Sequence, residues 1–124
     1  MSLTRIHSEV ATARDTFNFV ECHPAADGSV FVLAALKPAD QVYTLQVDFP
    51  ATYPNSPPNV TVRRPTLVGS KHRYNNGQIC YMLPSLWNPG RHDLTFVLAR
   101  VAKWLNKYEV YRATGTWPGA EHTH

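Results

Sequence analysis

Short extended segments joined by short connections constrain the fold of this chain more than any other feature of its sequence. Residues 17–20, 29–36, 42–49 and 59–63 are rich in aromatic and β-branched side chains, which favour strands. The connections between these segments are too short for the crossover of a dozen or more residues that a parallel pair requires. The sequence therefore predicts a four-stranded antiparallel meander.

Helical spacing of apolar residues predicts one helix at each end of the chain. Four apolar residues between Leu3 and Ala13 fall three or four positions apart, which is typical of a short amphipathic helix. Asp93 is a capping residue ahead of a longer apolar stripe that runs to about Arg112. Both helices must cover the sheet, so we expect an α+β fold in one domain of residues 1–124.

Composition excludes several classes of protein. Hydrophobic residues make up 44% and charged residues 17% of the chain, which are ordinary values for a globular protein. No apolar run approaches the roughly 18 residues of a membrane span, and no secretory signal is recognisable, so we expect a cytoplasmic protein. The net charge of +3 is dispersed, with Arg63-Arg64 as the only basic doublet, and no nucleic-acid partner is expected.

The stretch between Pro65 and Asp93 has no periodicity, yet it holds a cysteine, a tryptophan and two of the six histidines. A long irregular segment inside a compact domain is usually either functional or disordered. Its aromatic content favours order. We therefore expect the functional site in this stretch.

Three short motifs in and before this stretch resemble those of the ubiquitin-conjugating enzyme family. Residues 53–58 read Tyr-Pro-Asn-Ser-Pro-Pro, similar to the family's YPxxPP turn. Residues 76–80 read Asn-Gly-Gln-Ile-Cys, similar to its N/E-G-x-I-C motif. Residues 87–89, Trp-Asn-Pro, resemble the tryptophan and proline downstream of the nucleophile, one residue closer than in the common eukaryotic form. The correspondence spans residues 42–105, about half of the chain.

The C-terminal region resembles more particularly bacterial members of the family, from gene clusters with ubiquitin-activating-like or cGAS-like partners, some of which act in anti-phage defence. Trp104-Leu105, Tyr108-Glu109 and residues 114–119 carry this resemblance. It implies that the protein accepts the C-terminus of a ubiquitin-like or cGAS-like donor protein and passes it to an amine of a target protein. An activating enzyme is the further partner implied, and no cofactor is implied.

Cys80 is the nucleophile that the resemblance implies. Transfer between thioesters needs a group that attacks readily and also leaves readily, and a cysteine thiolate does both. A lone cysteine is more often a small buried hydrophobe, but Gly77 and Trp87 place Cys80 in an irregular segment. Cys22 is expected to be structural, and without secretory context the two cysteines are expected to stay reduced.

The sequence departs from the family in front of the cysteine. Eukaryotic members have His-Pro-Asn there, and the asparagine supports the loop that stabilises the oxyanion, whereas residues 71–74 here are Lys-His-Arg-Tyr. The expected catalytic substitutes are His72, eight residues before Cys80, and Asn76, with Asn75 as a further candidate. The sequence leaves the choice between them open.

Four residues are expected to contact the substrate proteins: Tyr74, Trp87, Asn88 and His122. The structural alternative is that Trp87 packs in the core and that His122 belongs to a solvated tail. His92, Asp93 or His122 could deprotonate the attacking amine. The cysteines and histidines do not have the spacing of a zinc site, so no metal is expected.

Two other functions compete with acyl transfer. A ubiquitin-conjugating-like module that has lost catalysis and only recruits a partner would explain the missing His-Pro-Asn, but the presence of Cys80 argues against it. A cysteine hydrolase could combine Cys80 with His72 or His92, because a thiol and an imidazole suffice for acyl cleavage. No hydrolase signature in the sequence supports that reading.

Overall fold

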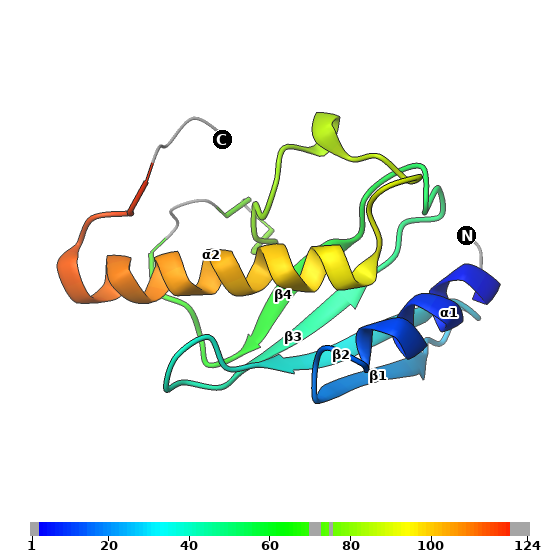
Figure 1. The fold of residues 1–124 in the computed structure, drawn as a ribbon, viewed down its shortest axis with the longest axis horizontal. Helices are drawn as coiled ribbons and strands as arrows, with labels where there is room; N and C mark the ends of the chain where they lie inside the picture. Colours follow the sequence, from blue (N-terminus) through cyan, green and yellow to red (C-terminus); the bar gives the residue numbers. More distant parts are fainter. Residues whose placement is uncertain (1–2, 70–72, 75, 120–124) are drawn as a thin grey trace.

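Two helices and a four-stranded sheet form the computed structural model, which describes residues 3–69, 73–74 and 76–119. The elements follow in the order α1 (Leu3–Ala13), β1 (Phe19–Pro24), β2 (Val30–Leu36), β3 (Tyr43–Asp48), β4 (Asn59–Arg64), the 3-10 turn η1 (Pro84–Leu86) and α2 (Leu94–Thr114). The strands pair in sequence order, each antiparallel to the next (Figure 1). The predicted α+β fold with an antiparallel meander is confirmed.

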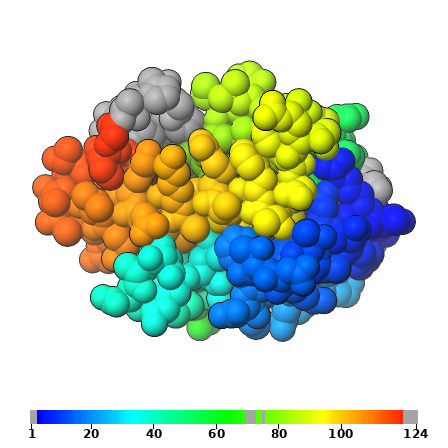
Figure 2. Space-filling view, viewed as in Figure 1, coloured from blue at the N-terminus to red at the C-terminus, as the bar shows by residue number. Residues whose placement is uncertain are grey.

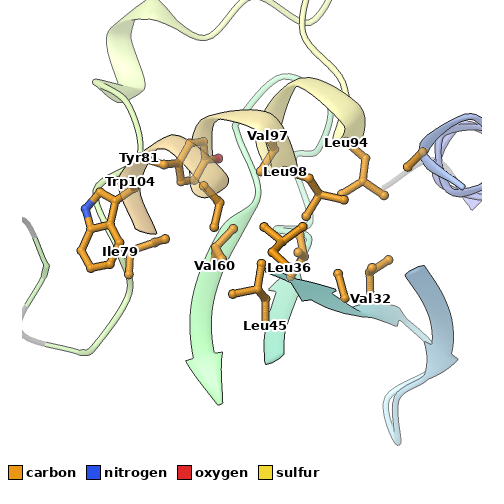
Figure 3. Packing of buried hydrophobic residues seen from close by; sticks show 14 of the residues in the cluster. Val32, Leu36, Leu45, Val60, Ile79, Tyr81, Leu94, Val97, Leu98 and Trp104 are labelled. Atoms are coloured by element: carbon orange, nitrogen blue, oxygen red, sulfur yellow. The ribbon is translucent and has the colours of Figure 1, made fainter. Parts of the chain in front are cut away.

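The alternating pattern in β3 places one face of the sheet in the core. Tyr43, Leu45 and Val47 are almost completely buried, while the residues between them are half-buried on the other face. Helix α2 lies across the buried face, with α1 beside it (Figures 1 and 2). In Figure 3, Leu94, Val97 and Leu98 of the helix point toward the apolar side chains of the strands.

Strand β1 begins two residues later than the sequence pattern indicates and extends to Pro24. The reason is that the backbone N–H of Phe17 donates to the carbonyl of Ala13 at 2.9 Å, so Phe17 belongs to the turn that follows α1. The following turn places Gly28 at φ 87°, a conformation that favours glycine. The other predicted bounds differ from the structure by one or two residues.

Helix α2 has the capping groups that its sequence indicates. The side chain of Asp93 accepts a hydrogen bond from the backbone N–H of Phe96 at 2.9 Å. At the other end, Gly115 adopts the left-handed conformation, and its N–H donates to the carbonyl of Tyr111 at 2.7 Å. Within the described residues, no helix combines the length and the apolar character needed to cross a membrane.

A buried carboxylate joins three separate parts of the fold. Glu9 of α1 is only 8% exposed, and its side chain accepts hydrogen bonds from three donors. The hydroxyl of Tyr53, in the loop between β3 and β4, lies 2.6 Å away, and the backbone N–H of Leu94 lies 2.8 Å away. The guanidinium of Arg5 forms the third contact and an ion pair. The negative charge of Glu9 thus also sits at the N-terminus of α2, where the helix dipole favours an anion.

Arg5 extends this connection to the segment before α2. One of its terminal nitrogens donates to the carbonyl oxygens of Pro89 and His92, at 2.8 and 3.0 Å. Its guanidinium also lies 5.8 Å from the centre of the Tyr53 ring. Helix α1, the β3–β4 loop and the start of α2 are therefore held in one arrangement by a single polar cluster.

We predict that Glu9→Ala lowers the free energy of unfolding by about 3 kcal/mol, because it leaves buried donors unpaired beside an uncompensated Arg5. Glu9→Gln retains one acceptor and is expected to lie between wild type and Glu9→Ala. Urea denaturation followed by circular dichroism measures both. The matched control is Glu21→Ala, which removes an exposed carboxylate whose side chain contacts His23. Equal stability of the Glu9→Ala and Glu21→Ala variants would contradict the role given to Glu9.

Candidate active site around Cys80

Cys80 follows a tight hairpin that brings the chain back to the free edge of β4. Gln78 forms an antiparallel bridge with Thr61, and the backbone N–H of Ile79 donates to the carbonyl of Val60 at 2.9 Å. The side chain of Ile79 lies among the core residues in Figure 3. This pairing fixes the backbone immediately before the thiol.

The turn of the hairpin is held by its own hydrogen bonds. The N–H of Tyr74 donates to the carbonyl of Gln78 at 2.8 Å, and the N–H of Gly77 donates to the carbonyl of Tyr74 at 3.0 Å. The side-chain oxygen of Asn76 accepts from the N–H of Gln78 at 3.0 Å. Gly77 has φ 86°, which accounts for the glycine of the motif. Asn76, predicted to be catalytic, therefore lies on the exposed turn, where its carbonyl oxygen stabilises the backbone.

Cys80 is 6% exposed. Burial raises the pKa of the Cys80 thiol, and the neighbouring Tyr74 partly offsets this effect. The pKa of Tyr74 is raised by its own burial and by the neighbouring Cys80. At neutral pH the resting site therefore holds a protonated thiol beside a neutral phenol.

Trp87 is buried and links two loops. Its indole N–H donates to the carbonyl of Pro54 at 2.7 Å, and its ring lies against those of Tyr53 and His92, with centroids 6.2 and 5.5 Å away. Its only hydrogen-bond donor outside the backbone is thus used within the protein. The structure places Trp87 in the packing between the β3–β4 loop and the segment before α2.

His92 and Asp93, the two candidate bases ahead of α2, use their side chains in hydrogen bonds to nearby backbone N–H groups. His92 accepts a hydrogen bond at Nδ1 from the N–H of Asn88 at 3.0 Å, and its ring stacks on Phe96 with centroids 4.0 Å apart. Asp93 caps the helix. The exposed Asn88 accepts from the N–H of Gly90 through its side-chain oxygen at 2.9 Å. These three side chains therefore hold the backbone of residues 88–93 in one conformation beside Trp87.

Three of the residues named from the sequence, His72, Asn75 and His122, lie outside the described residues. Among the described residues, no three or more His, Cys, Asp or Glu side chains are grouped to hold a metal ion. Both cysteines are free thiols, with Cys22 half-buried in β1.

A groove of about 700 Å³ lies beside the hairpin. It runs between the β3–β4 loop and the hairpin of residues 73–79, and it has both polar and apolar walls. The residues that line it are Pro50, Thr52, Ser56, Pro57, Asn59, Tyr74, Asn76, Gln78 and Pro84. None of them is charged, so the groove suits an uncharged, extended stretch of peptide.

Sequence reasoning missed the polar cluster of Glu9. Glu9 lies three residues after Ile6 and four before Ala13, so it falls on the apolar stripe of its helix. A carboxylate at such a position needs buried partners, and this signal could have been recognised.

Because burial raises the pKa of Cys80, we predict that iodoacetamide alkylates it with a midpoint more alkaline than that of an unstructured cysteine peptide. Only the thiolate reacts, so the rate should be low at pH 7 and increase through the alkaline range. The measurement uses a Cys22→Ala background and intact-mass detection at a series of pH values. The same protein in concentrated urea serves as the control and should follow the peptide. A native midpoint below the peptide's would contradict the prediction.

Comparison with known proteins agrees with this geometry. The sequence matches the family model described as "Type II CBASS E2 protein" over residues 9–124. None of the curated proteins matches the chain. Among solved structures, the chain is similar to the UEV domain in "A complex of the Vps23 UEV with ubiquitin", with a TM-score of 0.51 and 14% sequence identity. The similarity covers 86% of this chain and 96% of that one.

The likeness to the UEV domain concerns the fold alone, which is E2-like. The family model, by contrast, includes the β3–β4 loop, the hairpin with Cys80 and the whole of α2, and it continues to the last residue of the sequence. The chain belongs to the Type II CBASS E2 protein family.

Proposed function

We propose that this protein is a conjugating-enzyme-like acyltransferase, in which Cys80 accepts the C-terminus of a donor protein as a thioester and passes it to an amine of a target. The observation that carries the proposal is the position of Cys80 relative to the core. Its neighbours Ile79, Tyr81 and Met82 belong to the hydrophobic core cluster, whereas Cys80 is buried but lies outside that cluster, directly after the hairpin that pairs with β4.

The chemistry suits a thiol without a dedicated base. An incoming thioester is already activated, so the small fraction of thiolate present near neutral pH suffices for exchange. The sulfur of Cys80 attacks the donor carbonyl, and the donor's previous thiol leaves. An amine of the target then attacks the new thioester, and the Cys80 thiolate leaves in turn.

The partners proposed follow from the family. Membership in a CBASS family supports an interaction with other CBASS proteins in anti-phage defence, and the proposed donor is a ubiquitin-like or cGAS-like protein, loaded by an activating enzyme. The uncharged groove beside Tyr74 and Asn76 offers a surface for the donor's extended C-terminal segment. Exposed Asn88 is proposed to contact the same partners, while Trp87 supports the surface from below.

His72 and Asn76 are retained as proposed catalytic residues, and His122 as a proposed substrate contact. Asn76 uses its oxygen in the turn, so its contribution would come from the remaining N–H groups of the amide or from fixing the hairpin. The proposals for His72 and His122 rest on the sequence, because both lie outside the described residues.

A binding module without catalysis is the second candidate. The near-complete burial of Cys80 favours it, because a nucleophile must meet its substrate. The similar UEV structure is described as a complex with ubiquitin, and a corresponding non-covalent contact of this chain with a donor protein would be sufficient for such a role.

The deciding experiment is the formation of a covalent adduct. The protein is incubated with ATP and the proteins encoded beside it, and the mixture is run on non-reducing gels with and without dithiothreitol. We expect a larger species that dithiothreitol removes, present in wild type and in Cys22→Ala and absent in Cys80→Ala, because only Cys80 carries the donor. The absence of any adduct with an activating enzyme shown to be active would reject acyl transfer and favour the binding module.

A further inference from the structure

The positive charge of the chain has no dense run, yet it gathers in one part of the protein. Residues 65–108, from the end of β4 through most of α2, hold six basic residues and a single acidic one, Asp93. The rest of the chain holds the other six basic residues and eight acidic ones. The net charge of +3 thus combines +5 on the part that carries Cys80 with −2 on the remainder.

Three of these basic side chains form a stripe along one edge of α2, because positions three and seven residues apart lie on the same side of a helix: Arg100, Lys103 and Lys107. Nε of Arg100 donates to the carbonyl of Tyr81 at 3.2 Å. The ammonium of Lys107 lies near Gly119, where an added Cβ would be 3.4 Å from Nζ. The basic stripe therefore starts beside the residue that follows Cys80 and ends beside the C-terminal segment. Figure 2 shows α2 uncovered on this face of the molecule.

No carboxylate within the described residues neutralises the basic stripe. Two ion pairs occur there, and neither includes a residue of the stripe. Asp93 caps the start of α2, and Glu109, the acidic residue within that helix, contacts the hydroxyl of Tyr43 in β3. The charge of the stripe is therefore available to a partner.

We propose that the basic stripe of α2 is the docking surface for an acidic, extended segment of the target protein, which it holds beside Cys80. The proposal rests on the acyl transfer proposed above and deepens it by naming the class of target. Opposite charges attract such a segment from a distance and orient it before the amine meets the thioester.

The spacing of the basic stripe fits an extended acidic segment. From the helical rise per residue, its three positions lie roughly 4.5 and 6 Å apart along the helix axis. In an extended peptide, alternate side chains point to the same side and lie about 6.6 Å apart. Long, flexible side chains cover the difference. A segment with a carboxylate at every second residue can therefore oppose all three cations.

The basic stripe and the groove proposed for the donor are separate surfaces. The walls of the groove contain no charged residue and no residue of α2. Gln78 lines the groove, and the carbonyl of Tyr81 accepts from Arg100, so Cys80 lies between the two surfaces along the chain. A donor segment in the groove leaves the stripe to the target, and the two partners meet at Cys80.

The aromatic residues beside the stripe favour a polypeptide over a nucleic acid. Proteins that bind single-stranded nucleic acids present exposed aromatic rings on which bases stack. Here the ring of Phe96 stacks on His92, and the ring of Tyr111 lies against Trp117. These rings are used within the protein, so the stripe offers charge without a stacking platform.

The first test measures binding and needs no thioester. The probe is a fluorescein-labelled peptide with glutamate at alternate positions, compared by fluorescence anisotropy with the same peptide carrying glutamine. We expect the glutamate peptide to bind more tightly and to lose affinity as NaCl is added. Lys103→Glu should weaken its binding about fivefold, because an attraction is replaced by a repulsion.

The matched control is Lys37→Glu, which makes the same change of net charge at another exposed lysine, directly after β2. It should leave the affinity unchanged. Equal weakening by both substitutions would mean attraction to net charge alone and would overturn the proposal. Tighter binding of single-stranded DNA of the same charge would also overturn it and would assign the stripe to nucleic acid.

The second test measures transfer with a small donor. In the Cys22→Ala background, Cys80 is acetylated with the acetyl thioester of mercaptoethanesulfonate, and its discharge to lysine-containing glutamate and glutamine peptides is followed by intact mass. Wild type should reach half-maximal discharge at a lower concentration of the glutamate peptide, with equal maximal rates, because the stripe contributes to binding and not to the chemical step. Lys103→Glu should remove this preference, and Lys37→Glu should retain it. Equal half-maximal concentrations of both peptides in wild type would overturn the proposal.

The two tests separate this proposal from the acyl transfer on which it rests. If acetylated Cys80 discharges to free lysine but shows no preference for the acidic peptide, only the docking surface fails. If Cys80 accepts no acetyl group, acyl transfer fails and the role of the acidic partner as target fails with it, while anisotropy still decides whether the stripe binds an acidic segment. Equal thermal melting temperatures of Lys103→Glu and Lys37→Glu exclude a general loss of structure as the cause.

Discussion

The buried carboxylate of Glu9 is the interaction on which the arrangement of this protein depends. A charge removed from water must be surrounded by donors, and here those donors come from α1, from the β3–β4 loop and from the first turn of α2. Apolar packing alone would allow the helices to slide over the sheet. The directional contacts of one carboxylate instead fix where the long helix begins, and thereby where the segment before it, with Trp87 and His92, must lie.

The segments around Cys80 are attached to the elements that Glu9 holds together. Trp87 joins the segment before α2 to the β3–β4 loop, and the free edge of β4 receives the hairpin that ends at Cys80. Cys80 thus stands between core residues on a backbone held on both sides, through Val60 before it and Arg100 after it. A rigid support of this kind would suit the proposed acyl transfer, in which Cys80 meets a carbonyl in one orientation.

Much of this fold could be predicted from sequence periodicity, because periodicity reports which side chains face the core. The alternation in residues 42–49 and the stripe that begins at Leu94 identified the sheet face and the helix that covers it. Periodicity does not report partners of polar groups. The contacts of Glu9 and the role of Asn76 in the turn depend on backbone geometry, which brings these residues to their partners. The start of β1 was misplaced because one hydrogen bond holds Phe17 in the turn that follows α1.

The burial of Cys80 has a consequence for the chemical durability of the protein. Oxidation of a cysteine to sulfenic and then irreversible acids requires an accessible thiolate, and Cys80 is both 6% exposed and shifted toward its protonated form. Peroxide and small electrophiles would therefore react slowly with Cys80. The same cover that slows approach to the sulfur thus also keeps the thiol reduced.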